Sequence, residues 1–166
     1  MDDRPDELSE SDRQHLARCV ELATDALDAG DEPFGSLLVD PTGSVRFEDH
    51  NHVAGGDATR HPELEIARWA AAHLTPDERE RSTVYTSGEH CPMCSAAHAW
   101  VGLGRIVYAT SAEQLSGWYR EWGLDPAPVA PLPIGAVAPD VEVSGPDAGL
   151  SARVRELHAR LHGIEL

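Results

Sequence analysis

The sequence predicts an α/β domain, and three patterns in the chain support this class. Apolar residues near the start recur at helical spacing, and two β-rich runs joined by a turn follow them. Strand and helix patterns then alternate between residues 82 and 110, which predicts two parallel strands with a crossover helix. A length of 166 residues with 41% hydrophobic composition fits one domain over residues 1–166.

Each element is predicted from its own local pattern. Gly30 offers a stop for the first helix, within which Cys19 is expected to be buried. A Pro41-Thr42-Gly43 turn separates the first two strands, and Pro62 stands at a first helical position. The expected elements are helix 16–27, strands 34–40 and 44–47 (continuing toward 53), helix 62–74, strand 82–87, helix 91–101, strand 105–110, helix 112–122, an irregular stretch 125–139 and helix 151–162.

Charge and composition exclude several classes of function. Acidic residues number 29 against 13 basic ones, and the net charge of −16 disfavours binding to a nucleic-acid phosphate backbone. The chain has no lysine, which removes Schiff-base chemistry, pyridoxal phosphate attachment and a P-loop lysine. Residues Met1 to Pro5 lack a signal-peptide pattern, and no apolar run approaches the ~18 residues of a membrane span, so we expect a cytoplasmic protein without a membrane partner.

Cys91-Pro92-Met93-Cys94 is the first motif with chemical content. Its two sulfurs lie three residues apart at a predicted helix start, so both can point to one side of the first turn. The free N–H groups and positive dipole of that helix end favour the thiolates that zinc requires. A thioredoxin-type redox pair and two packed thiols are the alternative interpretations.

His61-Pro62-Glu63 supplies what the cysteines lack, an imidazole ligand and a carboxylate two residues later. Both side chains can serve one site only at a helix end, which Pro62 indicates. His61, Cys91 and Cys94 would leave the fourth position of tetrahedral Zn²⁺ for water, whose pKa zinc lowers toward ~7, and Glu63 could carry the proton. If His98 were a fourth ligand, the site would instead be closed and structural.

Together the two motifs resemble the cytidine deaminase superfamily, whose signature is H-x-E followed by P-C-x-x-C. The resemblance covers residues 34–110. It implies a three-layer α/β/α sandwich with a mixed five-stranded sheet, a homodimer, and hydrolytic removal of an exocyclic amine. Two residues depart from the family pattern: Pro62 replaces a small residue, and His90 stands where proline is usual.

Within the superfamily, the guanine deaminase and purine-acting branch is the nearest resemblance. Tyr85-Thr86-Ser87 and Pro33-Phe34-Gly35-Ser36 carry it, as does the Asp57-x-Thr59-x-His61 spacing. By this resemblance, the substrate-contacting residues would be Phe34, Asn51, Glu89 and Trp100. Trp100 has buried core packing as its alternative role.

The C-terminal segment 125–166 diverges and offers no counterpart to the tail that closes the pocket in that branch. The aromatic residues Trp118, Tyr119 and Trp122 could line the pocket entrance or form a subunit interface, and we predict the interface.

The function predicted from the sequence is therefore zinc-dependent hydrolytic deamination of a small amino-substituted heterocycle. A purine base such as guanine, or a nucleoside, is the expected substrate. A tRNA adenosine deaminase shares the motifs and is the first alternative, although the acidic charge speaks against it. A zinc-stabilised binding protein without catalytic activity is the second.

Overall fold

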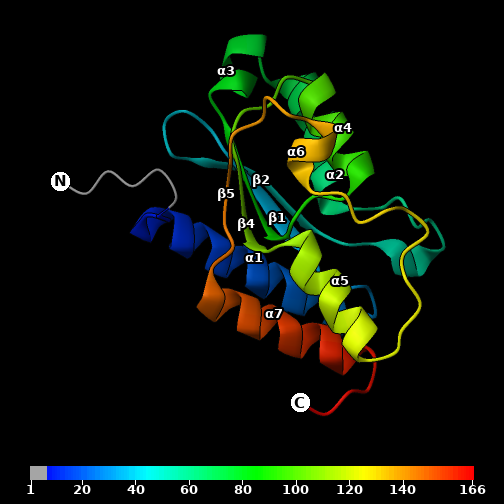
Figure 1. Ribbon diagram of the computed structural model, residues 1–166. Coiled ribbons are helices and arrows are strands. Elements are labelled where there is room, and N and C mark those ends of the chain that lie inside the picture. Colours follow the sequence, from blue (N-terminus) through cyan, green and yellow to red (C-terminus); the bar gives the residue numbers. More distant parts are fainter. Residues whose placement is uncertain (1–6) are drawn as a thin grey trace.

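The computed structural model describes residues 7–166, which form a mixed five-stranded sheet with helices on both faces (Figure 1). The sheet order is β2-β1-β3-β4-β5, with β1 antiparallel to β2 and β3, and β4 parallel to β3 and β5. The strands are β1 (Gly35–Val39), β2 (Val45–His50), β3 (Thr83–Gly88), β4 (Ile106–Thr110) and β5 (Val143–Ser144). This arrangement confirms the predicted three-layer sandwich. Residues 1–6 lie outside the described residues, and they include Met1 to Pro5, the segment that lacks a signal-peptide pattern.

The helices form the two outer layers. On one face lie α1 (Glu10–Asp28), α5 (Ala112–Glu121) and α7 (Ala148–Leu161), and on the other lie α2 (Pro62–His73), α3 (Pro76–Glu80), α4 (Pro92–Trp100) and α6 (Ile134–Val137) (Figure 1). A short 3-10 turn spans Val53–Gly55. Within residues 7–166, no helix is long and apolar enough to cross a membrane.

The first helix shows how local sequence produces this packing. Ser9 caps α1 in a reciprocal capping box with Asp12, which satisfies backbone donors at the helix start. Cys19 faces the sheet and is fully buried, as predicted. The helix approaches β1 so closely that a Cβ at Gly35 would collide with the Cys19 carbonyl oxygen and with Leu22. Glycine is therefore required at the start of β1.

The central strands carry the core on both faces of the sheet. Alternate residues of a strand point to opposite faces, so Leu37 packs toward Leu16 of α1 while Leu38 packs toward Ile66 of α2. Because α2 and α4 contact each other on the same face, their N-termini lie together at one end of the sheet. This packing positions the candidate site.

The segment from residue 112 onward differs most from the prediction. The stretch 125–139 is not wholly irregular, because α6 forms inside it, and its Ile134 N–H donates to the Glu89 carboxylate at 2.9 Å. Such a long-range contact leaves no local sequence pattern. Of the aromatic residues predicted to form an interface, Trp118 of α5 packs against a hydrophobic cluster that contains Val154 and Leu157 of α7. The interface itself stays a prediction.

Candidate functional site

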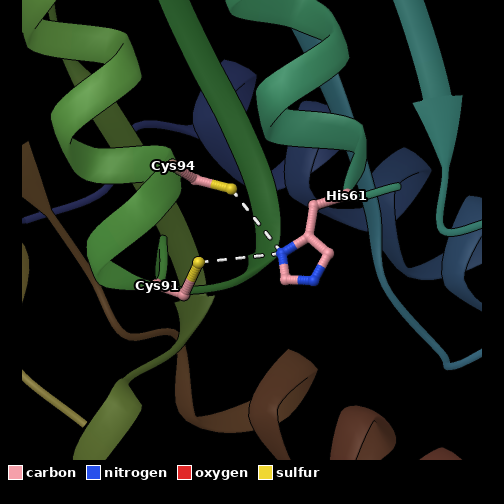
Figure 2. Close-up of side chains that lie close together, drawn as sticks. All are labelled: His61, Cys91 and Cys94. Carbon is pink, nitrogen blue, oxygen red and sulfur yellow. Dashed lines mark hydrogen bonds between the residues drawn. The ribbon is translucent and has the colours of Figure 1, made fainter. Parts of the chain in front are cut away.

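Three side chains that could hold a metal meet where α2 and α4 begin (Figure 2). His61 is the N-cap of α2, Cys91 is the N-cap of α4, and Cys94 lies in the first turn of α4. The Nδ1 atom of His61 is 3.7 Å from Cys91 Sγ and 3.6 Å from Cys94 Sγ. The prolines that follow His61 and Cys91 favour a helix start there, so both motifs form by local rules.

These distances fit zinc. A tetrahedral ion with Zn–S bonds of about 2.3 Å and Zn–N bonds of about 2.0–2.1 Å holds its sulfur and nitrogen ligands about 3.6 Å apart. The closed four-ligand alternative is wrong, because His98 lies outside this group of ligands and its Nε2 donates to the Gly104 carbonyl oxygen at 2.7 Å. An ion held by these three residues would keep one position open, as in catalytic zinc sites.

The electrostatics of the group couple Cys91 to His61, while the hydrogen bond with Cys91 and burial raise the pKa of Cys94 above its ordinary value. A hydrogen bond from Cys94 and the neighbouring His61 lower the pKa of Cys91 to about 4, against the opposing effect of its burial. The hydrogen bond to Cys91 in turn raises the pKa of His61 to about 9. A thiolate at Cys91 is therefore stable here, and a divalent ion would displace the proton from His61 on binding.

Glu63 lies beside this group and is 6% exposed. Ser36 Oγ lies 3.0 Å and Thr86 Oγ1 lies 2.9 Å from its Oε1. Thr86 Oγ1 is also 2.9 Å from the Gly88 carbonyl oxygen, so its one proton is shared between these two acceptors. Glu63 Oε2 lies 3.9 Å from Cys94 Sγ. Burial raises the pKa of Glu63, which brings the carboxyl group closer to the range where it can exchange a proton near neutral pH.

Ser36 and Thr86 were part of the motifs that carried the family resemblance, but the sequence did not connect them with Glu63. They lie opposite each other on β1 and β3, and their hydroxyl oxygens are 2.8 Å apart. The strand register and the packing of α2 on this face together bring both hydroxyl groups to the carboxylate. The only signal in the sequence for this contact was that each of two predicted strands carries a hydroxyl residue within an apolar run.

Asn51 is buried, and only part of its amide is used within the chain. Its backbone N–H donates to the Phe34 carbonyl oxygen at 3.0 Å, and its Oδ1 accepts from the Val53 N–H at 3.0 Å. Its Nδ2 is buried without a hydrogen-bond partner in residues 7–166. Leaving a buried donor unpaired costs about 1–3 kcal/mol, so this N–H group is available to an acceptor on a ligand.

Phe34 lies next to the segment that leads to Cys91. A Cβ on Gly88 would be 3.1 Å from the Phe34 ring, and the ring packs edge-on to His158 of α7 with 5.0 Å between centroids. The divergent C-terminal segment thus contributes a residue close to Phe34, which the sequence did not indicate. His158 is fully buried, and its Nε2 lacks a hydrogen-bond partner in the described part of the chain.

The predicted substrate contacts of Glu89 and Trp100 are not supported. Both carboxylate oxygens of Glu89 are already used, by the backbone N–H groups of Ala112 at 2.7 Å and of Ile134 at 2.9 Å. A cavity of about 330 Å³ adjoins Glu89, but none of the predicted zinc ligands lines it. Trp100 ends α4 nine residues after Cys91, which is about 13 Å along the helix, and it is 89% exposed. Its alternative role as buried core is therefore wrong, while the substrate contacts of Glu89 and Trp100 stay predictions.

His90, which replaces the usual proline, points into the protein. It is 1% exposed, and its ring packs edge-on to His98 with 5.4 Å between centroids. Burial holds the pKa of His90 well below its ordinary value, so the ring is neutral. This residue fills core space behind Cys91.

Comparison with known proteins agrees with this geometry. The profile of the cytidine and deoxycytidylate deaminase zinc-binding region matches residues 9–110. The chain belongs to this deaminase family. The match begins earlier than the predicted core at residue 34, because α1 is part of the shared domain. The enzyme class, hydrolytic deamination with a zinc cofactor, follows from this membership.

Several relatives of this deaminase act on free bases according to their names. It is 36% identical over 148 residues to the probable cytosine deaminase of Schizosaccharomyces pombe, covering 84% of this chain and 86% of the relative. It is 35% identical over 96 residues to the guanine deaminase of Bacillus subtilis, covering 57% of this chain and 61% of that relative. A solved guanine deaminase from Nitrosomonas europaea shares the fold, with a TM-score of 0.65 and 22% identity over 93% of this chain and 87% of that one.

Proposed function

We propose that this chain hydrolytically deaminates a free nucleobase, with His61, Cys91 and Cys94 as zinc ligands and Glu63 as the proton carrier. One observation carries the proposal: an imidazole nitrogen and two sulfurs lie at zinc-ligand spacing, with a buried carboxylate oxygen 3.9 Å from one sulfur. A zinc ion held there would supply a Lewis acid with one open position for water.

The role of Glu63 follows from its hydrogen bonds. Ser36 and Thr86 hold Oε1, so Oε2 is the oxygen directed toward the cysteines and free to move a proton. It would accept one proton from the attacking water and deliver it to a ring nitrogen, then accept the second proton from the added hydroxyl group and deliver it to the leaving amine. Water and the amino-substituted base are consumed, and the carbonyl compound and ammonia are formed.

Asn51 would orient the base. The Asn51 backbone pairs with Phe34, which precedes Ser36 by two residues. Because a strand advances about 3.3 Å per residue, Asn51 lies about 7 Å along the sheet from Ser36, whose hydroxyl contacts Glu63. Its free Nδ2 donor matches a ring carbonyl oxygen. Cytosine and guanine both carry such an oxygen next to a ring amidine, whereas adenine does not.

Cytosine is the first substrate to test, because the alignment with the fission-yeast relative extends over 84% of this chain. Guanine, the substrate expected from the sequence, is the second, because the purine-type motifs at residues 33–36 and 85–87 support it. The net charge of −16 continues to oppose the tRNA alternative. Single-domain organisation, a homodimer and a cytoplasmic location remain predictions.

The test compares Glu63→Gln with wild-type enzyme on cytosine, guanine, adenine, their nucleosides and a tRNA anticodon stem, with ammonia release as the readout. Glu65→Gln is the matched control, since Glu65 lies on the same helix and its side chain forms ion pairs with Arg60 and Arg68. We expect E63Q to lose turnover by at least about 100-fold, within the range of general acid-base catalysis, while zinc content is unchanged.

Activity retained in E63Q would refute the assigned role. Ammonia from no compound in the panel would favour the non-catalytic alternative, and activity confined to the tRNA stem would favour the tRNA alternative.

A further inference from the structure

A second group of metal-ligand side chains lies outside the proposed zinc site. Asp31, His50 and His52 each offer one ligand atom, and these atoms all lie within 4.8 Å of one another. Asp31 follows the end of α1, His50 ends β2, and His52 lies just before the 3-10 turn. The fold therefore brings together two segments that are about twenty residues apart in the chain.

Hydrogen bonds already set both imidazoles in the form that binds a metal. Nδ1 of His50 lies 2.8 Å from the Asn51 carbonyl oxygen, which can only accept, so Nδ1 carries the proton and Nε2 keeps its lone pair. Nε2 of His52 lies 2.8 Å from the Asp49 carboxylate, which leaves the lone pair on Nδ1. Metal-binding histidines typically donate their other N–H to a carbonyl or carboxylate in this way.

The acidic ligand is also held in place. Asp31 is 7% exposed, and its Oδ1 accepts a hydrogen bond from the Ala54 N–H at 2.8 Å. Its Oδ2 accepts no hydrogen bond from the protein within residues 7–166 and is available to a cation. Asp31 and Asp49 place two carboxyl groups beside the His50 and His52 rings, whose centroids lie 4.4 Å apart. A dication would be attracted to this arrangement.

We propose that Asp31, His50 and His52 bind a second divalent transition-metal ion. Two imidazoles and a carboxylate suit Zn²⁺, Co²⁺, Ni²⁺ or Cu²⁺, and the absence of sulfur separates this ligand set from His61, Cys91 and Cys94. The ion would link the segment after α1 to the end of β2 on both sides of Asn51. Its binding does not depend on the role proposed for Asn51 or on catalysis.

The experiment titrates metal-free, full-length protein with Co²⁺ and follows stoichiometry and absorbance. We expect two equivalents per chain in the wild type, one with a thiolate-to-cobalt charge-transfer band and one without it. His52→Gln and Asp31→Asn should each weaken the band-free equivalent by at least about 10–100-fold, the loss produced even by removing an outer partner of a ligand. Gln at position 52 can keep the hydrogen bond to Asp49, and Asn at position 31 can keep the bond from the Ala54 N–H, so folding should be preserved.

Two further variants separate this site from other causes of binding. His73→Gln is the matched control, because His73 also bonds a backbone carbonyl through Nδ1 at 2.8 Å but belongs to neither metal-ligand group. It should keep both equivalents. Cys91→Ser should lose the charge-transfer band and keep the other equivalent. A wild type without a band-free equivalent, or a band-free equivalent that persists in H52Q and D31N, would overturn the proposal.

Discussion

Thr86→Val tests whether the buried hydroxyl groups position Glu63. The Thr86 hydroxyl is fully buried and lies 2.9 Å from Glu63 Oε1, and valine has nearly the same volume without the donor. A hydrogen bond to a charged group contributes about 1.5–3 kcal/mol, and 1.36 kcal/mol on a barrier is tenfold in rate. Because Ser36 Oγ still lies 3.0 Å from the same oxygen, we expect a loss at the lower end of this energy range, which is about a tenfold fall in kcat/KM.

The assay measures kcat/KM, zinc content and the thermal unfolding midpoint of the same preparations. Thr110→Val is the matched control, since that hydroxyl is equally buried but bonds Ser151 at 3.2 Å, away from Glu63. A positioning role predicts that T86V loses activity with zinc fully bound, while T110V does not. Ser36→Ala combined with T86V should lose more than either single variant. If T86V stayed within twofold of wild type, or lost activity only through lost zinc, the reasoning would be refuted.

Four other outcomes are expected. Chelation should lower the unfolding midpoint in scanning fluorimetry, and added Zn²⁺ should restore it in the wild type but not in Cys94→Ser; a midpoint insensitive to chelator would contradict a resident ion. Burial lowers the pKa of His158 to about 3, so only the unfolded state binds this proton between about pH 6.5 and 3. The free energy of unfolding should therefore fall by up to about 1.4 kcal/mol per pH unit as the pH drops through that window. Urea melts of His158→Gln should show a shallower fall with pH, and equal pH slopes in variant and wild type would contradict this role of His158. Asn51→Ala should lower kcat/KM for the preferred base by about 10–100-fold with zinc unchanged, and no loss would exclude the proposed contact. Trp100 is 89% exposed, and large aromatic side chains are enriched in subunit interfaces, so Trp100→Glu should convert the predicted homodimer to monomers in light scattering; a monomeric wild type would show the homodimer prediction to be wrong.

Local sequence rules account for the elements that carry the two motifs. Proline after His61 and after Cys91 starts a helix, and residues at such a start can point together. The strand-helix-strand order around Cys91 is likewise a short-range pattern. For these reasons the three ligands and Glu63 could be grouped without coordinates, and so could the fold class.

Residues whose role depends on register or on long-range packing escaped prediction. The two carboxylate oxygens of Glu89 bind segments that begin 23 and 45 residues later, which no spacing rule reveals. Trp100 was expected near the substrate or in the core, yet the length of α4 carries it away from Cys91 and leaves it exposed.

The sequence by itself determined the deaminase motifs, the α/β class and a net charge of −16. Only the tertiary structure decided that Ser36 and Thr86 hold one oxygen of Glu63, and that Asp31 meets His50 and His52. The physical reason is the separation along the chain over which each interaction acts. Helix starts and strand alternation act over a few residues, whereas these contacts depend on which strands pair and which helix packs on each face.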